Sequence, residues 1–164
     1  MGKFLAALIL GSAILAGGGL YYLQVYAYYD EVVPDGRDDV RLTRLTSEQV
    51  ETIAYSDFQA IDSESSPIRY RACFNTSLAL DALADAYQPY DKPVPLEAPG
   101  WFDCFDADDI AAGLQDGSAL AFMGQKDIEY GIDRIVAVTD DGRGYVWHQI
   151  NRCGKVGFDG LATP

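Results

Sequence analysis

The feature that most constrains this chain is an uninterrupted apolar run near its start. From Phe4 to Tyr29 the sequence reads FLAALILGSAILAGGGLYYLQVYAYY, and no side chain in it carries a formal charge. An α-helix rises about 1.5 Å per residue and needs roughly 20 apolar residues to cross the hydrocarbon layer of a bilayer. The run is longer than this, so we expect residues 1–29 to form a transmembrane anchor.

The flanks of the run indicate its direction. Lys3 precedes it, Asp30 and Glu31 follow it, and tyrosines gather at its C-terminal end. Basic residues favour the cytoplasmic side of a membrane, and tyrosine favours the interface. These signals predict a cytoplasmic N-terminus and a C-terminal domain outside the cytoplasm. A cleaved signal peptide is the alternative, because Val25-Tyr26-Ala27 resembles a cleavage site, but the apolar run exceeds the usual length of about 7–15 residues.

Small residues recur four apart within the run, a spacing that lets membrane helices approach one another closely. Each glycine of Gly17-Gly18-Gly19 weakens an isolated helix by about 1 kcal/mol relative to alanine. A partner helix in the membrane would offset that loss. We therefore predict contacts with other transmembrane subunits, through the candidate helix-packing residues Ala7, Gly11, Ser12, Ala13, Ala16 and Gly17.

The rest of the chain is strongly acidic. Of the 164 residues, 25 are acidic and 12 are basic; every acidic residue lies at or beyond Asp30, and Lys3 is the only basic residue before it. Residues 30–164 therefore carry a formal net charge of −14 and suit one domain by length. This charge excludes nucleic acid as a partner, because phosphate binding needs a basic face. It is compatible with steering of a basic protein, or with a role in solubility alone.

Residues 30–45 mix charges with a proline and a glycine, which is typical of an extended stalk. We expect the folded domain to cover residues 46–164. Thr46 and Gln49 resemble a capping box and predict a short helix over residues 47–55.

The next segments predict a hairpin and then a helix. Strands over residues 58–62 and 68–74 flank the turn-rich sequence SESSP. Asn75 is expected to cap a helix that reaches Tyr87.

Four prolines between Gln88 and Gly100 predict an extended crossing, because proline fixes φ and cannot donate a ladder hydrogen bond. Asp106 is expected to cap a helix that ends at Asp116-Gly117. Helices mixed with hairpins, without βαβ alternation, predict an α+β domain with a small antiparallel sheet and two or three short helices. Its last three strands are expected at residues 118–123, 132–139 and 144–150.

Three cysteines allow three disulfide pairings in an oxidising compartment. Cys73 and Cys104 each lie in an aromatic context, RYRACF and GWFDCF, and a bridge between them would tie down the proline-rich crossing. We favour this pair. Cys153 is then left free or bridges to another chain.

Candidate catalytic and metal-binding residues are few. The single histidine, His148, and Cys153 form a conceivable nucleophile pair, but no orienting acid or oxyanion motif accompanies them. There is no CxxC motif and no pair of histidines, so zinc and copper lack a ligand set. The acidic run over residues 103–109 lacks the glycine and the glutamate of a calcium loop. We expect no catalytic, cofactor-binding or metal-binding residue, and no enzyme activity.

Several blocks of sequence carry a family resemblance: RYRACF, GWFDCFDADDI, ALAFMGQKDIEYGIDRIVAV, and GRGYVWHQIN followed by CG. They resemble a family of uncharacterised bacterial single-pass envelope proteins with a domain of unknown function. The resemblance covers nearly the whole chain. It implies a location in the bacterial inner membrane with the domain in the periplasm, and it assigns no catalytic residue.

We interpret the chain as a non-catalytic accessory or assembly subunit of an inner-membrane complex. A respiratory complex is the most natural host, since an acidic periplasmic surface would steer a basic carrier such as a c-type cytochrome. The alternative is a periplasmic thiol- or metal-handling assembly factor that uses Cys153 and His148. A sensor domain is disfavoured, because only residues 1–3 would remain in the cytoplasm.

Overall fold

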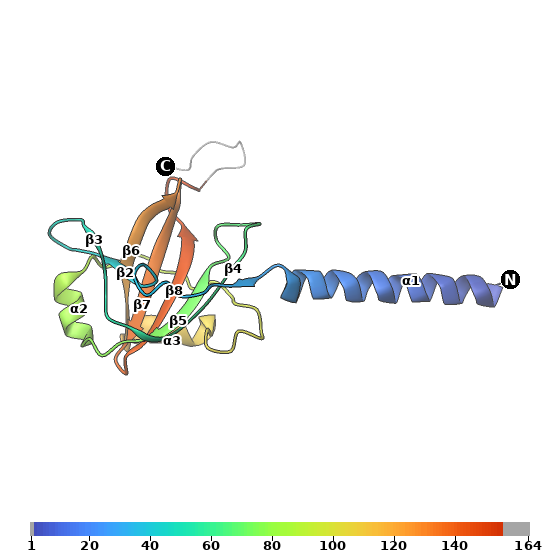
Figure 1. Cartoon of the computed structure of the whole chain (residues 1–164), viewed down its shortest axis with the longest axis horizontal. Coiled ribbons are helices and arrows are strands. Elements are labelled where there is room, and N and C mark those ends of the chain that lie inside the picture. The colour runs from blue at the N-terminus through green and yellow to red at the C-terminus, as the bar shows by residue number, and fades with distance from the viewer. Residues whose placement is uncertain (1, 156–164) are drawn as a thin grey trace. The chain divides into compact units, whose positions relative to one another are not determined.

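A computed structural model of the chain describes residues 2–155 (Figure 1). The chain divides into two compact units, Met1–Asp30 and Glu31–Pro164. The first unit is helical, and the second, in its described part up to residue 155, combines an antiparallel sheet with two helices. The predicted α+β class is confirmed.

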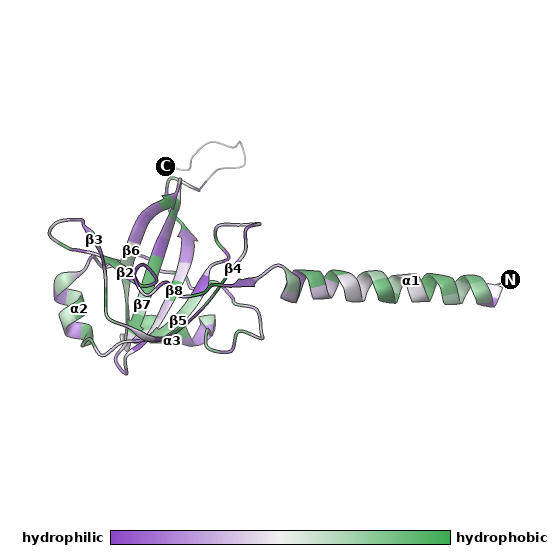
Figure 2. Ribbon diagram, viewed as in Figure 1, coloured by the Kyte–Doolittle hydropathy of each residue, from purple (hydrophilic) through white to green (hydrophobic). Residues whose placement is uncertain are grey.

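The first unit consists of helix α1, Gly2–Tyr22, which continues as a short π-helix, Leu23–Ala27. No residue of α1 is buried, and Figure 2 shows apolar residues along its length. Among the described residues, Gly2–Ala27 is the one helix long and apolar enough to cross a membrane. A helix of this kind at an N-terminus is typical of a membrane span or a signal sequence.

The second unit is built on a six-stranded sheet with the order β1-β4-β5-β8-β7-β6. The predicted hairpin is confirmed as β4 paired with β5, and the three predicted C-terminal strands are confirmed as β6, β7 and β8, although β6 continues past its predicted end at Met123 to Glu129. A separate two-stranded sheet joins β2 and β3. The strands are β1 Asp30–Glu31, β2 Arg41–Thr43, β3 Val50–Thr52, β4 Ser56–Asp62, β5 Arg71–Asn75, β6 Ala119–Glu129, β7 Ile132–Thr139 and β8 Arg143–Ile150.

Both faces of the sheet are covered around the apolar run at residues 135–138. The four side chains of that run are fully buried on β7, where they alternate between the two faces. On one face, Val136 and Val146 belong to the main core together with Leu42 of β2 and Leu83 of helix α2, Leu80–Ala86. On the other face, Trp147 lies edge-to-face with Phe105, 6.4 Å between ring centroids.

Helix α3, Ala107–Asp116, follows Phe105 and confirms both of its predicted ends. Asp106 is the N-cap, and its carboxylate accepts hydrogen bonds from the backbone N–H groups of Asp108 and Asp109. Gly117 ends the helix in the left-handed conformation, with φ of 87°.

The proline-rich segment, residues 88–100, crosses the second face of the sheet as an extended chain, and we call it the strap. Groups on successive strands hold it, so each part of the strap has a fixed position on the sheet. Hydrogen bonds join Tyr90 to Asp133 on β7, Val94 to Gln149 on β8, and Leu96 and Glu97 to Arg71 on β5.

The predicted stalk over residues 30–45 is wrong for its second half. Val40 and Leu42 are fully buried, and strand β2 belongs to the domain. Asp39 also folds the preceding turn, because its carboxylate accepts hydrogen bonds from the backbone N–H groups of Asp35 and Gly36. Two apolar residues among many charges are a weak signal for a buried strand, although here both belong to the hydrophobic core.

The predicted helix over residues 47–55 is wrong as well. Glu48 takes a left-handed conformation with φ of 54°, and strand β3 follows it. The Ser47 hydroxyl accepts a hydrogen bond from the N–H of Gln49, which makes a local turn. Val50 and Thr52 are β-branched and suit the strand that pairs with β2.

The helix predicted after Asn75 exists but begins later. Asn75 is the last residue of β5, and its amide donates to the Asp57 carboxylate instead of capping a helix. The N-cap of α2 is Ala79, which makes no side-chain cap. The turn before the helix is held by Thr76, whose hydroxyl donates to the carbonyl of Ala54.

Candidate functional site

Two adjoining hollows open beside the first part of the strap, and together we call them the strap groove. One, of about 640 Å³, lies between residues 90–94 of the strap and residues 149–155 at and beyond the end of β8. The other, of about 660 Å³, lies between the strap, the β6–β7 hairpin and the loop after β8. They share the lining residues Tyr90, Asp91, Asn151 and Arg152.

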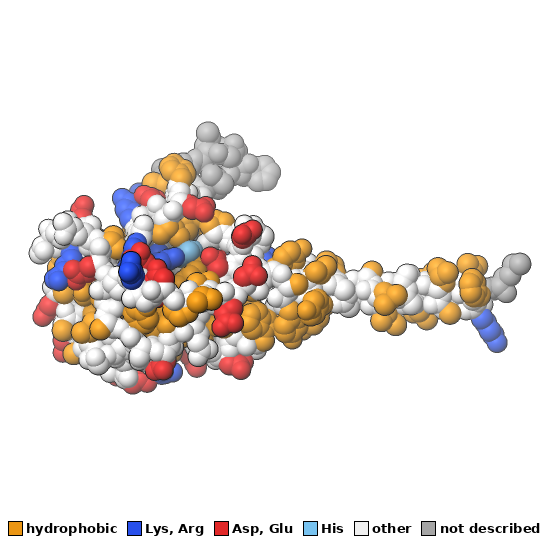
Figure 3. Space-filling view, viewed as in Figure 1, with side chains coloured by type: hydrophobic (Ala, Val, Ile, Leu, Met, Phe, Trp, Pro, Cys, Tyr) orange, Lys and Arg blue, Asp and Glu red, His pale blue; other side chains and the backbone are white. Residues whose placement is uncertain are grey.

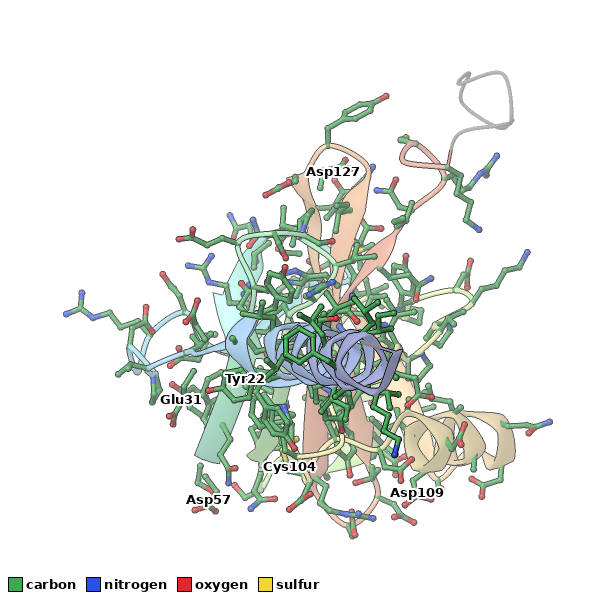
Figure 4. The ribbon with its side chains drawn as sticks, turned by 90° about the vertical axis from the view of Figure 1, so that its right-hand side faces the viewer. Tyr22, Glu31, Asp57, Cys104, Asp109 and Asp127 are labelled. Atoms are coloured by element: carbon green, nitrogen blue, oxygen red, sulfur yellow. A yellow bond between two sulfur atoms is a disulfide. The ribbon has the colours of Figure 1, made fainter. Side chains whose placement is uncertain are left out.

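Asp133 ties together the three segments that form this groove. It is buried, with 4% of its surface exposed. Its carboxylate accepts hydrogen bonds from the Tyr90 hydroxyl at 3.3 Å, the Asn151 amide at 2.9 Å and the Asp127 N–H at 3.0 Å. Figure 4 labels Asp127 near the end of the β6–β7 hairpin. The strap, the hairpin and the loop after β8 are therefore held around one carboxylate.

The loop after β8 is also packed closely against the hairpin. The side-chain oxygen of Asn151 accepts hydrogen bonds from the N–H groups of Cys153 and Gly154. A Cβ atom on Gly154 would lie only 2.3 Å from the carbonyl oxygen of Gly131. Only glycine permits this approach, so the loop that carries Arg152 and Cys153 has a defined position.

Burial raises the pKa of Tyr90 to about 12, and the neighbouring Asp133 charge adds to the effect. Tyr90 therefore remains a neutral hydrogen-bond donor at physiological pH. It holds the strap to β7 and is not a base or nucleophile.

Lys92 is held in an unusual backbone conformation at the edge of the groove. Its backbone φ angle is 57°, a value that residues other than glycine rarely adopt. Gln149 fixes the segment by donating to the carbonyl of Lys92 at 3.2 Å and accepting from the N–H of Val94 at 2.7 Å. Strained residues of this kind are enriched at functional sites.

His148 lies outside the groove, in a buried stack. Its ring is stacked nearly parallel to the Tyr70 ring, with 4.7 Å between the ring centroids. The Arg134 guanidinium lies over the Tyr70 ring, 4.7 Å from its centroid. The Pro67 carbonyl can only accept a hydrogen bond, so Nδ1 of His148 donates to it at 2.6 Å. Nε2 then accepts from Nε of Arg134 at 3.0 Å. Both ring nitrogens are occupied in the neutral form.

The His148 stack predicts a loss of stability in mild acid. Burial, with a smaller contribution from the Arg134 charge, lowers the pKa of His148 to about 4 from its ordinary 6.5. The unfolded chain therefore takes up the proton first as the pH falls, and stability present above pH 6.5 is lost toward pH 4. We expect about 2 kcal/mol of loss between pH 7 and 5, measured by urea unfolding.

His148→Gln is the matched variant for this prediction, because its amide can still donate to Pro67 and accept from Arg134. The free energy of unfolding of this variant should be the same at pH 7 as at pH 5. An equally steep loss in His148→Gln would assign the acid sensitivity to other groups.

The predicted disulfide is present: Cys73 on β5 is bonded to Cys104, and their Cα atoms are 6.2 Å apart. Cys153 is free and exposed, and it lines the strap groove. The described contacts do not join Cys153 to His148. Within residues 2–155, no group of three His, Cys, Asp or Glu side chains is placed to hold a metal ion.

The candidate helix-packing residues form three pairs on three sides of α1, because each residue of an α-helix is turned by about 100° from the last. Apart from the adjoining residues and the backbone of the helix itself, no atom of the described chain lies within 4 Å of a Cβ placed on Gly11 or Gly17. The pairs are Ala7 with Gly11, Ser12 with Ala16, and Ala13 with Gly17.

The groove residues escape sequence reasoning for an identifiable reason. Tyr90, Asp133 and Asn151 come from three distant parts of the chain and belong to no motif. The one available signal is Asp133-Arg134 at the start of an otherwise apolar strand, and a charge there is usually solvent-exposed.

The fold and the groove define a small α+β domain that follows an N-terminal apolar helix and that carries an open groove. The chain belongs to DUF6446, a family of unknown function, whose model matches residues 40–164. No curated protein and no solved structure matches the chain.

Proposed function

We propose that the protein is a membrane-anchored, non-catalytic accessory or assembly subunit of a bacterial inner-membrane complex. The observation that carries this proposal is helix α1, which has no charged residue from Phe4 onward and no buried residue. Its glycines and its small-residue pairs remain available for another membrane helix. The function follows from contact with partners and requires no reaction.

The domain is proposed to lie in the periplasm, with the N-terminus in the cytoplasm. Lys3 before the helix and the acidic residues after it support this direction. The disulfide Cys73–Cys104 supports it independently, because such bonds persist in oxidising compartments.

A respiratory complex is the proposed host. The domain's net charge of −14 favours encounter with a basic protein such as a c-type cytochrome. Figure 3 shows acidic side chains at several places on the visible face of the domain. Such an encounter would weaken as ionic strength rises.

A thiol- or metal-handling assembly factor is the second candidate. The exposed thiol of Cys153 in the strap groove favours it. His148 argues against it, because both ring nitrogens are engaged within the core.

The three small-residue pairs allow a direct test of the subunit proposal. Gly11→Ile, Ala16→Ile and Gly17→Ile each enlarge one side of α1 and leave its hydropathy high. Only one side of α1 can face a given partner helix. We therefore expect the amount of complex to fall about tenfold in one variant and to stay unchanged in the other two. Native gels after extraction in a mild detergent measure this.

Ile14→Leu is the control, because it changes shape without adding volume. Migration of the wild-type protein as a lone monomer in every detergent would overturn the subunit proposal. Equal loss in all three enlarged variants would indicate a damaged helix and would overturn the one-sided contact.

A further inference from the structure

The strap groove differs in charge from the rest of the domain. The part of the chain from residue 30 onward carries a net charge of −14, yet basic side chains gather in the groove. Those that line its two hollows are Lys92, Lys126, Arg152 and Lys155.

Most other basic residues of the domain are already engaged. Arg41, Arg44 and Arg143 form ion pairs with nearby carboxylates. Arg71 holds the strap, and Arg134 holds the His148 stack. In the described part of the chain, no ion pair includes Lys92, Lys126 or Arg152. Their charge is directed to the groove and to solvent.

Two acidic residues also line the groove, and they do not cancel this charge. Asp133 is buried, and its carboxylate accepts three hydrogen bonds within the wall. Asp91 stands at the junction of the two hollows. The lining keeps an excess of positive groups, which is complementary to a negatively charged ligand.

Apolar side chains line the same two hollows as the basic ones. Val94 is 53% exposed, Ile150 is 39% exposed, and Tyr130 at the end of the β6–β7 hairpin is 84% exposed. Each hollow has the volume of a small-ligand site, and the two adjoin through a shared set of residues. Two adjoining hollows that are lined by both basic and apolar groups suit a stretch of polypeptide better than a single small anion.

We infer that the strap groove binds an extended, acidic segment of a partner protein, in which carboxylates alternate with apolar side chains. The carboxylates meet Lys92, Lys126 and Arg152, and the apolar side chains meet Val94 and Ile150. The inference rests on the proposed function, because it names the chemistry of a partner of the same subunit. The acidic outer surface then selects a basic partner, and the basic groove selects an acidic one.

The test uses the full-length protein in phosphatidylcholine nanodiscs and a fluorescein-labelled peptide of alternating Glu and Leu. We expect saturable binding by fluorescence anisotropy, weakened by salt. Lys92→Glu/Lys126→Glu should weaken it about tenfold. Arg37→Glu/Arg143→Glu changes the net charge equally outside the groove and should weaken it far less.

The native thiol locates the binding. Cys153 lines the groove, so the bound peptide should slow its alkylation by a maleimide several-fold. Peptide binding without protection of Cys153, or equal weakening by the two charge-reversal variants, would overturn the inference. Equal binding of an uncharged control peptide of alternating Gln and Leu would overturn it, as would full competition by phosphate or by anionic vesicles.

These outcomes are separate from those of the subunit proposal. A complex on native gels that survives Lys92→Glu/Lys126→Glu would overturn the groove as its contact and leave the subunit role intact. Peptide binding by a protein that forms no complex would overturn the subunit role and leave the groove inference intact.

Discussion

Replacing Arg71 by leucine is expected to destabilise the domain by about 4 kcal/mol. The guanidinium is buried, with 4% of the residue exposed, and it donates to four backbone carbonyls. Without it those carbonyls lose their partners, and each buried unsatisfied group costs about 1–3 kcal/mol. The accepting residues are Ile68 and Tyr70 before β5, and Leu96 and Glu97 in the strap.

The measurement is urea unfolding of the full-length protein in detergent, followed by tryptophan fluorescence, since Trp147 is fully buried. Domains are stable by roughly 5–15 kcal/mol, so Arg71→Leu lies close to the limit of folding. Arg71→Lys should lie between wild type and Arg71→Leu, because an ammonium cannot reach both segments with a planar fork. Exposed Arg37→Leu is the control. A loss for Arg71→Leu no larger than for Arg37→Leu would show that water replaces the guanidinium.

The elements that sequence reasoning places correctly are those whose signals are local and strong. Helix α3 has a capping aspartate and a terminating glycine, and β7 has an apolar run that only a covered strand explains. The disulfide follows from two aromatic contexts. Each of these signals lies within a few residues of the structure that it predicts.

The errors arise where tertiary contacts override a local pattern. Thr46 and Gln49 resemble a capping box, yet the chain there forms β3 because Val50 and Thr52 pair with β2. Val40 and Leu42 look like parts of a charged stalk until β2 is packed in the core. Long-range pairing decides both cases.

The strap groove illustrates the same limit for function. Its position depends on Tyr90, Asp133 and Asn151 meeting from three segments. The amino-acid composition does not reveal the positive charge of the groove, because the basic residues that line it are outnumbered by acidic residues elsewhere. Only the fold separates a basic groove from an acidic domain.

The disulfide is expected to give the second largest effect. Cys73→Ala/Cys104→Ala should lower stability by about 3.5 kcal/mol, from the chain-entropy model for a sequence separation of 31 residues. The bond closes the loop that contains α2 and the whole strap, so its loss frees that loop in the unfolded chain. Reduction of the wild-type protein should give the same urea midpoint as the double variant. Cys153→Ala should leave the midpoint unchanged, because this thiol is free and exposed.

The disulfide and Arg71 hold the same end of the strap, since Leu96 and Glu97 precede Cys104 by only a few residues. Removing either one loosens the segment that the other restrains, so their effects should not add. In the protein without the disulfide, Arg71→Lys should cost less than it does in the wild type. Full additivity in a double-mutant cycle would contradict this coupling and would mean that strand β5, rather than the strap, is what Arg71 stabilises.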